Sequence, residues 1–216
     1  EETNLITKYS SLAKLLKITA YVLRWKHRIV KRDKNTAIQN ITYGPNAAAI
    51  ISVNELEYAR TKIHQIVQSK FFANEIKCLK NGKGISKKSK LYLLNPFLDQ
   101  DEVIRVGGRL NNAENMQRDK KNPIVLPANT HFTKLVFSHE HIKLLHAGPQ
   151  ALLASVREKY WPLGGRNVAK KTVHKCISCF RTKPATYQPI LGNLPAPRIE
   201  VANHAFLTSG VDFAGP

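Results

Sequence analysis

Two histidines and two cysteines with a metal-ligand spacing constrain this chain more than any other feature of its sequence. His141 and His146 precede Cys176 and Cys179 in the pattern H-x4-H-x29-C-x2-C. Imidazole nitrogens and thiolates are the ligands of closed, four-coordinate zinc sites, and a C-x2-C spacing lets both sulfurs reach one ion. The pattern therefore predicts a zinc site formed by these four side chains, which would hold two distant segments together.

Other histidines lie near enough in sequence to compete for this site. His141 precedes His146 by roughly 7.5 Å along a helix axis, which two imidazoles can span where a helix ends. His139 shares a helix face with His146 but lies roughly 10.5 Å from it along the axis, so it would need a kink. His174 is too close to Cys176 to fit the geometry of the cysteine pair. His139 therefore stays open as the alternative to His141.

A redox dithiol is the other interpretation of the two clustered cysteines. Such motifs normally open a helix after a strand, whereas Cys176 and Cys179 follow a predicted helix. Cys78 lies outside the pattern and is interpreted as a small apolar residue. Four protein ligands leave no coordination position for a water, so the zinc would be structural. A stand-alone zinc hydrolase is the corresponding alternative function, and the closed ligand set argues against it.

The segment around the four ligands has the signals of three short helices. Asn129 or Thr130 can cap a first helix that runs to about residue 145. Gly148 and Pro149 begin a second helix, which Trp161-Pro162 ends, and Asn167 can cap a third helix that reaches Cys176. A core of this size is small, and zinc binding supplies on the order of 10 kcal/mol. We therefore expect residues 131–180 to unfold when the metal is removed.

The residues upstream of this segment predict longer helices and a small sheet. Apolar side chains at helical spacing indicate helices over 9–30 and about 53–72, the second with the capping box Ser52-Val-Asn-Glu55. The period changes over 91–126, where LYLLNPFLDQDEVIRVGGRL predicts two short strands around an acidic turn and NPIVLP a third. Gly107 and Gly108 indicate a bulge or bend, because no phosphate-loop motif follows them.

These patterns give the expected architecture. The fold class is mainly α with a small β subdomain and a three-helix zinc-binding unit. The expected division of the chain is a helical region, a β subdomain, the zinc-binding domain, a proline-rich linker and the start of a further domain, over residues 1–80, 91–128, 129–183, 184–203 and 204–216. The run GVDFAGP at the end indicates that the chain is a piece of a longer polypeptide.

Net charge and cysteine content limit which partners and which cellular compartment are expected for this chain. The 34 Lys and Arg residues against 15 acids give a net charge of +19, which favours a polyanionic partner, DNA first and RNA second. The basic run RWKHRIVKRDK over 24–34 fits a solvated helix end, a nucleic-acid contact or a nuclear localisation signal. No apolar run is long enough to span a membrane. Three cysteines, two of them clustered, favour a reducing, intracellular setting.

Long stretches of the sequence resemble a known family. The runs LNPFLDQDEVIRVGGRL, NPIVLP, LLHAGPQALLASVREKYWPLGGRNVAKKTVHKCISCFRTKP and GVDFAGP resemble the Pol polyprotein of BEL/Pao-type LTR retrotransposons, from behind RNase H into the integrase. The resemblance is close over 91–216 and looser over 9–80. In that family the HHCC module is a helix-turn-helix-like unit of the integrase N-terminus. The H-x4-H spacing is one residue longer than the H-x3-H common in retroviral integrases.

The resemblance implies a function that spacing alone does not. It implies a zinc module that contacts the DNA at the element ends and helps integrase chains associate, in a cytoplasmic particle and the nucleus. GVDFAGP matches the segment bearing the first of three catalytic carboxylates, so Asp212 would hold Mg²⁺ in a complete integrase. The other two carboxylates are not in this chain, which should therefore not cut or join DNA alone. A host zinc-dependent nucleic-acid-binding protein derived from such an element is the alternative.

Overall fold

The computed structural model describes residues 6–32, 51–108, 116–182, 190–199, 201, 203–207 and 209–211. The chain divides into two compact units, Glu1–Thr182 and Lys183–Pro216. The first unit is mainly helical with one small sheet, which confirms the predicted fold class. The described residues of the second unit are exposed and include a single helix, α10 (Ala196–Ile199). None of the described helices is long and apolar enough to cross a membrane.

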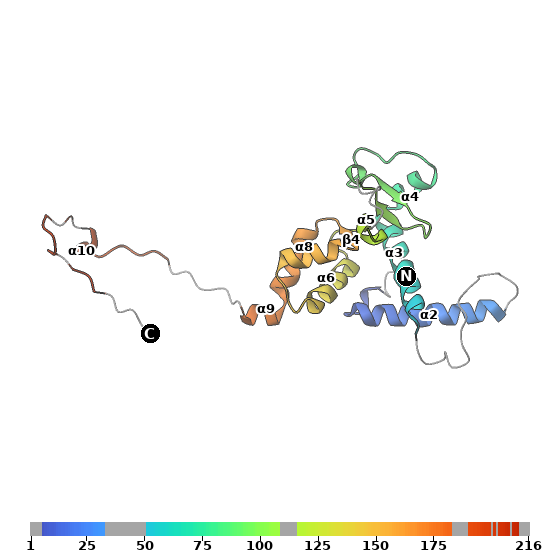
Figure 1. Cartoon of the computed structure of the whole chain (residues 1–216), viewed down its shortest axis with the longest axis horizontal. Helices are drawn as coiled ribbons and strands as arrows, with labels where there is room; N and C mark the ends of the chain where they lie inside the picture. The colour runs from blue at the N-terminus through green and yellow to red at the C-terminus, as the bar shows by residue number, and fades with distance from the viewer. Residues whose placement is uncertain are drawn as a thin grey trace. The chain divides into compact units, whose positions relative to one another are not determined.

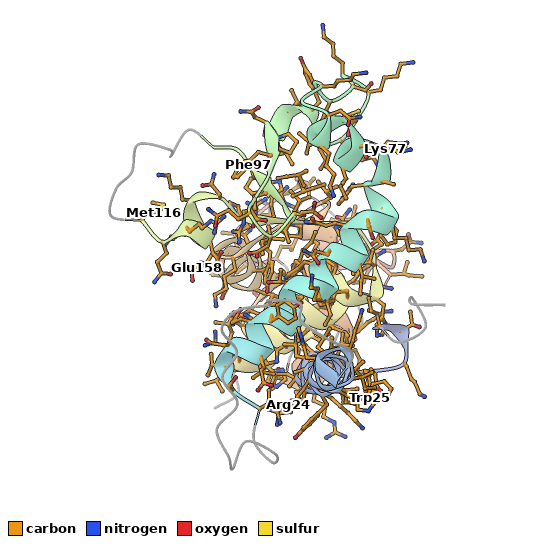
Figure 2. The ribbon with its side chains drawn as sticks, turned by 90° about the vertical axis from the view of Figure 1, so that its right-hand side faces the viewer. Arg24, Trp25, Lys77, Phe97, Met116 and Glu158 are labelled. Atoms are coloured by element: carbon orange, nitrogen blue, oxygen red, sulfur yellow. The ribbon has the colours of Figure 1, made fainter. Side chains whose placement is uncertain are left out.

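Two long helices cross at one end of the first unit (Figure 1). Helix α2 (Leu12–Arg32) buries the predicted apolar stripe, including Leu15, Leu16 and Ala20. Helix α3 (Val53–Phe71) begins with the predicted capping box, in which Ser52 and Glu55 bond each other's backbone N–H groups. Figure 2 looks nearly along α2, with Arg24 and Trp25 labelled on it.

A buried ion pair joins these two helices. The Arg24 guanidinium donates from Nε to Glu55 Oε1 at 2.7 Å and from Nη2 to Glu55 Oε2 at 2.6 Å. Both side chains are buried, and Glu55 Oε2 also accepts from the Ser52 N–H. The pair lowers the pKa of Glu55 to about 2, chiefly through the hydrogen bond from Arg24. A different crossing of α2 and α3 would separate the two side chains and leave buried charges without partners, which is costly. The ion pair therefore favours the observed crossing.

The sheet contains a strand that the sequence patterns did not predict. Its order is β1 (Pro96–Leu98), β2 (Ile104–Val106), β3 (Ile124–Leu126) and β4 (Tyr160–Pro162). The first three match the predicted strands, and β1 and β2 pair antiparallel. Strand β4 pairs parallel to β3 and comes from the predicted zinc-binding segment. The expected boundary near residue 128 thus lies between segments that share one sheet and one compact unit, and the five-part division of the chain stays a prediction.

Residues Tyr160 to Pro162 correct one detail of the helix predictions. They were expected to belong to the second helix and its end, but α7 (Pro149–Arg157) stops earlier and these residues form β4. The side chain of Tyr160 packs against His64 and the larger apolar core instead of lying on a helix face. A three-residue strand is too short to show the alternation by which strands are recognised.

The third helix of the zinc-binding segment also begins differently from the prediction. Helix α8 (Gly165–Lys175) starts before Asn167, and no side chain caps it. Gly164, with φ +67°, turns the chain from β4 into α8 in a left-handed conformation that glycine adopts without strain. At Gly165, a Cβ would lie 2.7 Å from Pro162 Cγ and 2.9 Å from Leu153 Cδ1. The two glycines therefore allow α8 to pack closely on α7 and β4.

Two apolar clusters hold the first unit together. The larger takes residues from α2, α3, α6 (His131–Lys143), α7 and α8, among them Leu15, Ile63, Phe132, Leu152 and Val168. The smaller lies between α4 (Ala73–Lys80) and the sheet. The upstream helices and the zinc-binding helices therefore share one core. The remaining described elements of this unit are a 3-10 helix over Tyr92–Leu94, α5 (Arg118–Lys121) and α9 (Ile177–Thr182).

Candidate metal centre

The C-terminal end of α6 explains the spacing of the two histidines. The helix starts at the predicted cap Thr130 and ends at Lys143, and Leu145 and His146 then adopt positive φ angles of 51° and 65°. The Leu145 N–H donates to Ile142 O at 3.0 Å, and the His146 N–H donates to His141 O at 2.9 Å. This pair of bonds is the Schellman motif, in which the chain turns back on the last helical turn.

The turn places the two imidazoles side by side. In a Schellman motif, the residue after the left-handed position contacts the third-last helical residue, usually through apolar side chains. Here those positions are His146 and His141, whose ring centroids lie 4.8 Å apart with the planes at 89°. Nδ1 of His146 is 3.2 Å from Nε2 of His141. The H-x4-H spacing is therefore the spacing that this turn requires.

The two cysteines lie at the junction of α8 and α9. Cys176 ends α8 with extended backbone angles, and its carbonyl accepts from the Phe180 N–H in the first turn of α9. The pKa of the Cys176 thiol is lowered, first because the backbone N–H of Cys179 donates to its sulfur and then through Ser178. The junction thus favours the thiolate, which is the form that binds metal.

The four predicted ligands converge on one point. Their ligand atoms all lie within 4.8 Å of one another. Cys179 Sγ is 3.2 Å from His141 Nε2 and 3.8 Å from His146 Nδ1, and Cys176 Sγ is 3.2 Å from His146 Nδ1. A tetrahedron with Zn–N near 2.1 Å and Zn–S near 2.3 Å has edges of roughly 3.4–3.8 Å. Donor types and separations therefore both fit a zinc ion, so the four residues form a possible zinc site.

The imidazole of His141 is the inner member of this group. Its side chain is 2% exposed, whereas those of the two cysteines are half-buried. Burial, with a smaller contribution from His146, lowers the pKa of His141. A neutral imidazole is the form that coordinates metal, so the surroundings of His141 favour a ligand over a cation.

The competing residues lie elsewhere. His139 is exposed and is not in the group, so the structure brings His141 and not His139 to the cysteines. His131, a further histidine of this segment, donates from Nε2 to the Tyr9 carbonyl at 2.7 Å. His174 is exposed, and Cys78 is a half-buried free thiol. Asp212 lies outside the described residues, so the expectation of a Mg²⁺ ligand there stays a prediction.

Comparison with known families points to the same segment. Residues 128–185 match the family model described as Integrase zinc binding domain. The match contains α6, α7, β4, α8 and α9 and all four members of the His/Cys group. This part of the chain is therefore similar to the integrase zinc-binding domain, and the similarity supports an integrase segment. Searches of curated proteins and of solved structures returned no match.

Proposed function

We propose that this chain is a segment of a BEL/Pao-type retrotransposon Pol polyprotein, and that α6 to α9 form its integrase N-terminal zinc-binding domain. The observation that most strongly supports this proposal is that the four His and Cys ligand atoms lie close together within the matched segment. The resemblance of residues 91–216 to that polyprotein supports the retrotransposon type. In such an element the domain works in the cytoplasmic particle and the nucleus.

In this proposal His141, His146, Cys176 and Cys179 hold a structural zinc. The ion supplies binding free energy that ties α6 to the α8–α9 junction, and the full ligand set leaves no site for a catalytic water. The chain's own contribution is the Schellman turn, which aims His146, and the backbone N–H groups that stabilise the Cys176 thiolate. The zinc therefore acts on the fold and not on a substrate.

DNA is the proposed partner, and α8 is the element that contacts it. Arg166, Lys170 and His174 recur every four residues along α8 and are exposed, while Val168 and Ala169 face the core. No acidic residue lies in this helix. A helix with one buried face and one cationic face is how helix-turn-helix proteins meet the DNA backbone. Self-association of integrase chains and the Mg²⁺ role of Asp212 belong to the complete protein, so the chain alone should give no strand transfer.

The DNA proposal is tested by fluorescence anisotropy with a labelled duplex over a range of salt concentrations. We expect affinity to fall steeply with salt. The slope of log affinity against log salt concentration should be about 2 smaller in magnitude for the Arg166→Glu/Lys170→Glu variant, because each lost phosphate contact reduces that slope by about 0.9. The control is Lys77→Glu on α4, another exposed lysine that is far from α8 in sequence. Affinity that is independent of salt, or equal losses in both variants, would reject α8 as the DNA-contacting helix.

A further inference from the structure

A groove runs between α6 and α8 beside the metal centre. It has a volume of about 640 Å³ and is lined from α6 by Lys134, Ser138 and Ile142, and from α8 by Val168, Lys171 and Lys175. These residues recur every three or four positions on each helix, so they form one continuous face of each. The metal group closes one end of the groove through His141, His146 and Cys176.

The charges of this groove are of one sign. Lys134, Lys171 and Lys175 are exposed, and no carboxylate is among the lining residues. Within the part of the chain that the structure describes, none of these three lysines forms an ion pair. Unpaired cations along both walls of a groove attract an anionic occupant and orient it along the groove.

The groove also offers apolar surface. Ile142 is 64% exposed in the groove wall. Three more large apolar side chains, Leu145, Ile177 and Phe180, are exposed and are sequence neighbours of the metal ligands, although they do not line the groove itself. Large exposed apolar side chains gathered at one place mark interaction surfaces, since each loses free energy by facing water. The occupant therefore needs apolar side chains as well as negative charge.

We propose that this groove docks an acidic amphipathic segment of a partner protein, with its apolar side chains on Ile142 and its carboxylates on the three lysines. A single helix or an extended peptide fits a concave groove of this size and mode of recognition. Duplex DNA presents phosphates to the lysines but no apolar side chain to pack on Ile142. A second copy of this chain, with net charge +19, brings like charges to the site.

The test uses a defined probe on the zinc-loaded whole chain. The probe is a fluorescent helical peptide of about 16 residues made of Glu, Ala and Leu, with Leu at i, i+3, i+4 and i+7. One control peptide replaces each Leu by Ser, and another replaces each Glu by Lys. We expect the probe to bind and neither control peptide to bind. Probe binding should change the amide chemical shifts of groove residues, including Ser138, Ile142 and Thr172.

Charge reversal separates this groove from the DNA-contacting face of α8. Lys171→Glu/Lys175→Glu should weaken the peptide by about tenfold or more, because two attractions become repulsions. Arg166→Glu/Lys170→Glu makes the same charge change on the same helix, outside the groove, and should leave the peptide affinity nearly unchanged. All four side chains are exposed, so both variants should fold.

Three results would overturn the proposal. Equal binding of the Ser-substituted peptide would show simple charge attraction without an apolar site. Equal weakening by the two variants, or no binding of the probe, would show that the groove is not the docking site. Duplex DNA that displaces the probe and gives the same shift map would make nucleic acid the occupant. The first two results do not bear on whether α8 contacts DNA through Arg166 and Lys170, whereas the third would place the DNA contact in the groove.

Discussion

Leu145 occupies a backbone conformation that suits glycine better than leucine. It takes the left-handed position of the Schellman turn, with φ 51°, and is 88% exposed. A leucine there is strained and contributes little packing. We expect Leu145→Gly to raise the free energy of unfolding of the zinc-loaded chain by about 1 kcal/mol, measured by urea denaturation.

The same substitution at Ile142 is the matched control. Ile142 is also exposed but lies inside α6, where glycine weakens a helix by about 1 kcal/mol. The two variants should therefore shift stability in opposite directions. A loss of stability on Leu145→Gly would contradict the Schellman geometry and the explanation of the H-x4-H spacing.

His64 is a buried histidine with no polar partner. Its side chain is 1% exposed, and neither ring nitrogen has a hydrogen-bond partner among the described residues. The ring instead contacts those of Phe132 and Tyr160, with centroids 5.2 and 5.4 Å away. Burial lowers the pKa of His64 to about 3 from its usual value of 6.5. The unfolded chain therefore binds a proton more readily than the folded chain between these values.

This difference gives a pH dependence with a defined sign. Above about pH 6.5 His64 is neutral in both states and has no effect on the slope; as the pH falls from 6.5 towards 3, it should lower stability. We expect His64→Leu to remove this part of the slope, with the other titrating groups common to both proteins. Parallel stability curves for wild type and His64→Leu over this range would show that His64 protonates in the folded state.

At the level of helices and strands, the side chain of Gln68 joins α3 to two strands, β2 and β3. Its amide donates to Ile104 O at 3.0 Å and to Val125 O at 2.8 Å, and its Oε1 accepts from Ile104 N at 2.7 Å. Strands β2 and β3 have a single paired position, Arg105 with Ile124, so the amide supplies bonds that the ladder lacks. Gln68→Leu would leave these backbone groups buried without partners.

We expect Gln68→Leu to lower the free energy of unfolding by about 2–4 kcal/mol, measured by urea denaturation. The control is Gln65→Leu on the same helix, whose amide lies in an exposed contact with the Asp101 carbonyl and with Lys62. It should change stability by about 0.5 kcal/mol or less. Equal effects of the two substitutions would mean that Gln68 is not what joins the sheet to α3.

Local signals predicted some of these elements and could not predict others. The capping box at Ser52 and the cap at Thr130 depend on residues close in sequence, and the structure has both where they were expected. The predicted ligands lie close enough together to form a possible zinc site. Strand β4 and the role of Gln68 depend on partners far along the chain. The start of α8 depends on Gly164 and Gly165, whose effect is packing and backbone angle and not a capping side chain.

At the scale of the whole molecule, the metal centre and the apolar core hold different parts of the zinc-binding segment. The core includes Phe132, Leu135 and Leu152 together with residues of α2 and α3. Cys176, Cys179 and α9 lie outside it, and α9 has no buried residue. Residues 131–180 were expected to unfold together when zinc is removed. Because part of this segment packs in the shared core, we now expect that part to stay folded.

Chelation should therefore act most strongly on α9 and on the C-terminal end of α8, beyond the core residues Val168 and Ala169. We expect amide hydrogen exchange there to become fast after treatment with a strong chelator, because metal binding worth on the order of 10 kcal/mol is lost. The centre of α3 should remain comparatively protected, since Ile63 and Val67 stay in the core. Unchanged exchange in α8 and α9 after the metal has been removed would show that zinc does not stabilise this end.

Coordination of zinc by the two histidines and two cysteines can be measured by X-ray absorption at the zinc edge of the purified chain. We expect one zinc per chain, with two nitrogen ligands near 2.1 Å and two sulfur ligands near 2.3 Å. Cys179→Ser should reduce the sulfur contribution by half or abolish binding. Absence of stoichiometric zinc, or a zinc surrounded by nitrogen and oxygen alone, would contradict the coordination by His141, His146, Cys176 and Cys179 on which the proposed function depends.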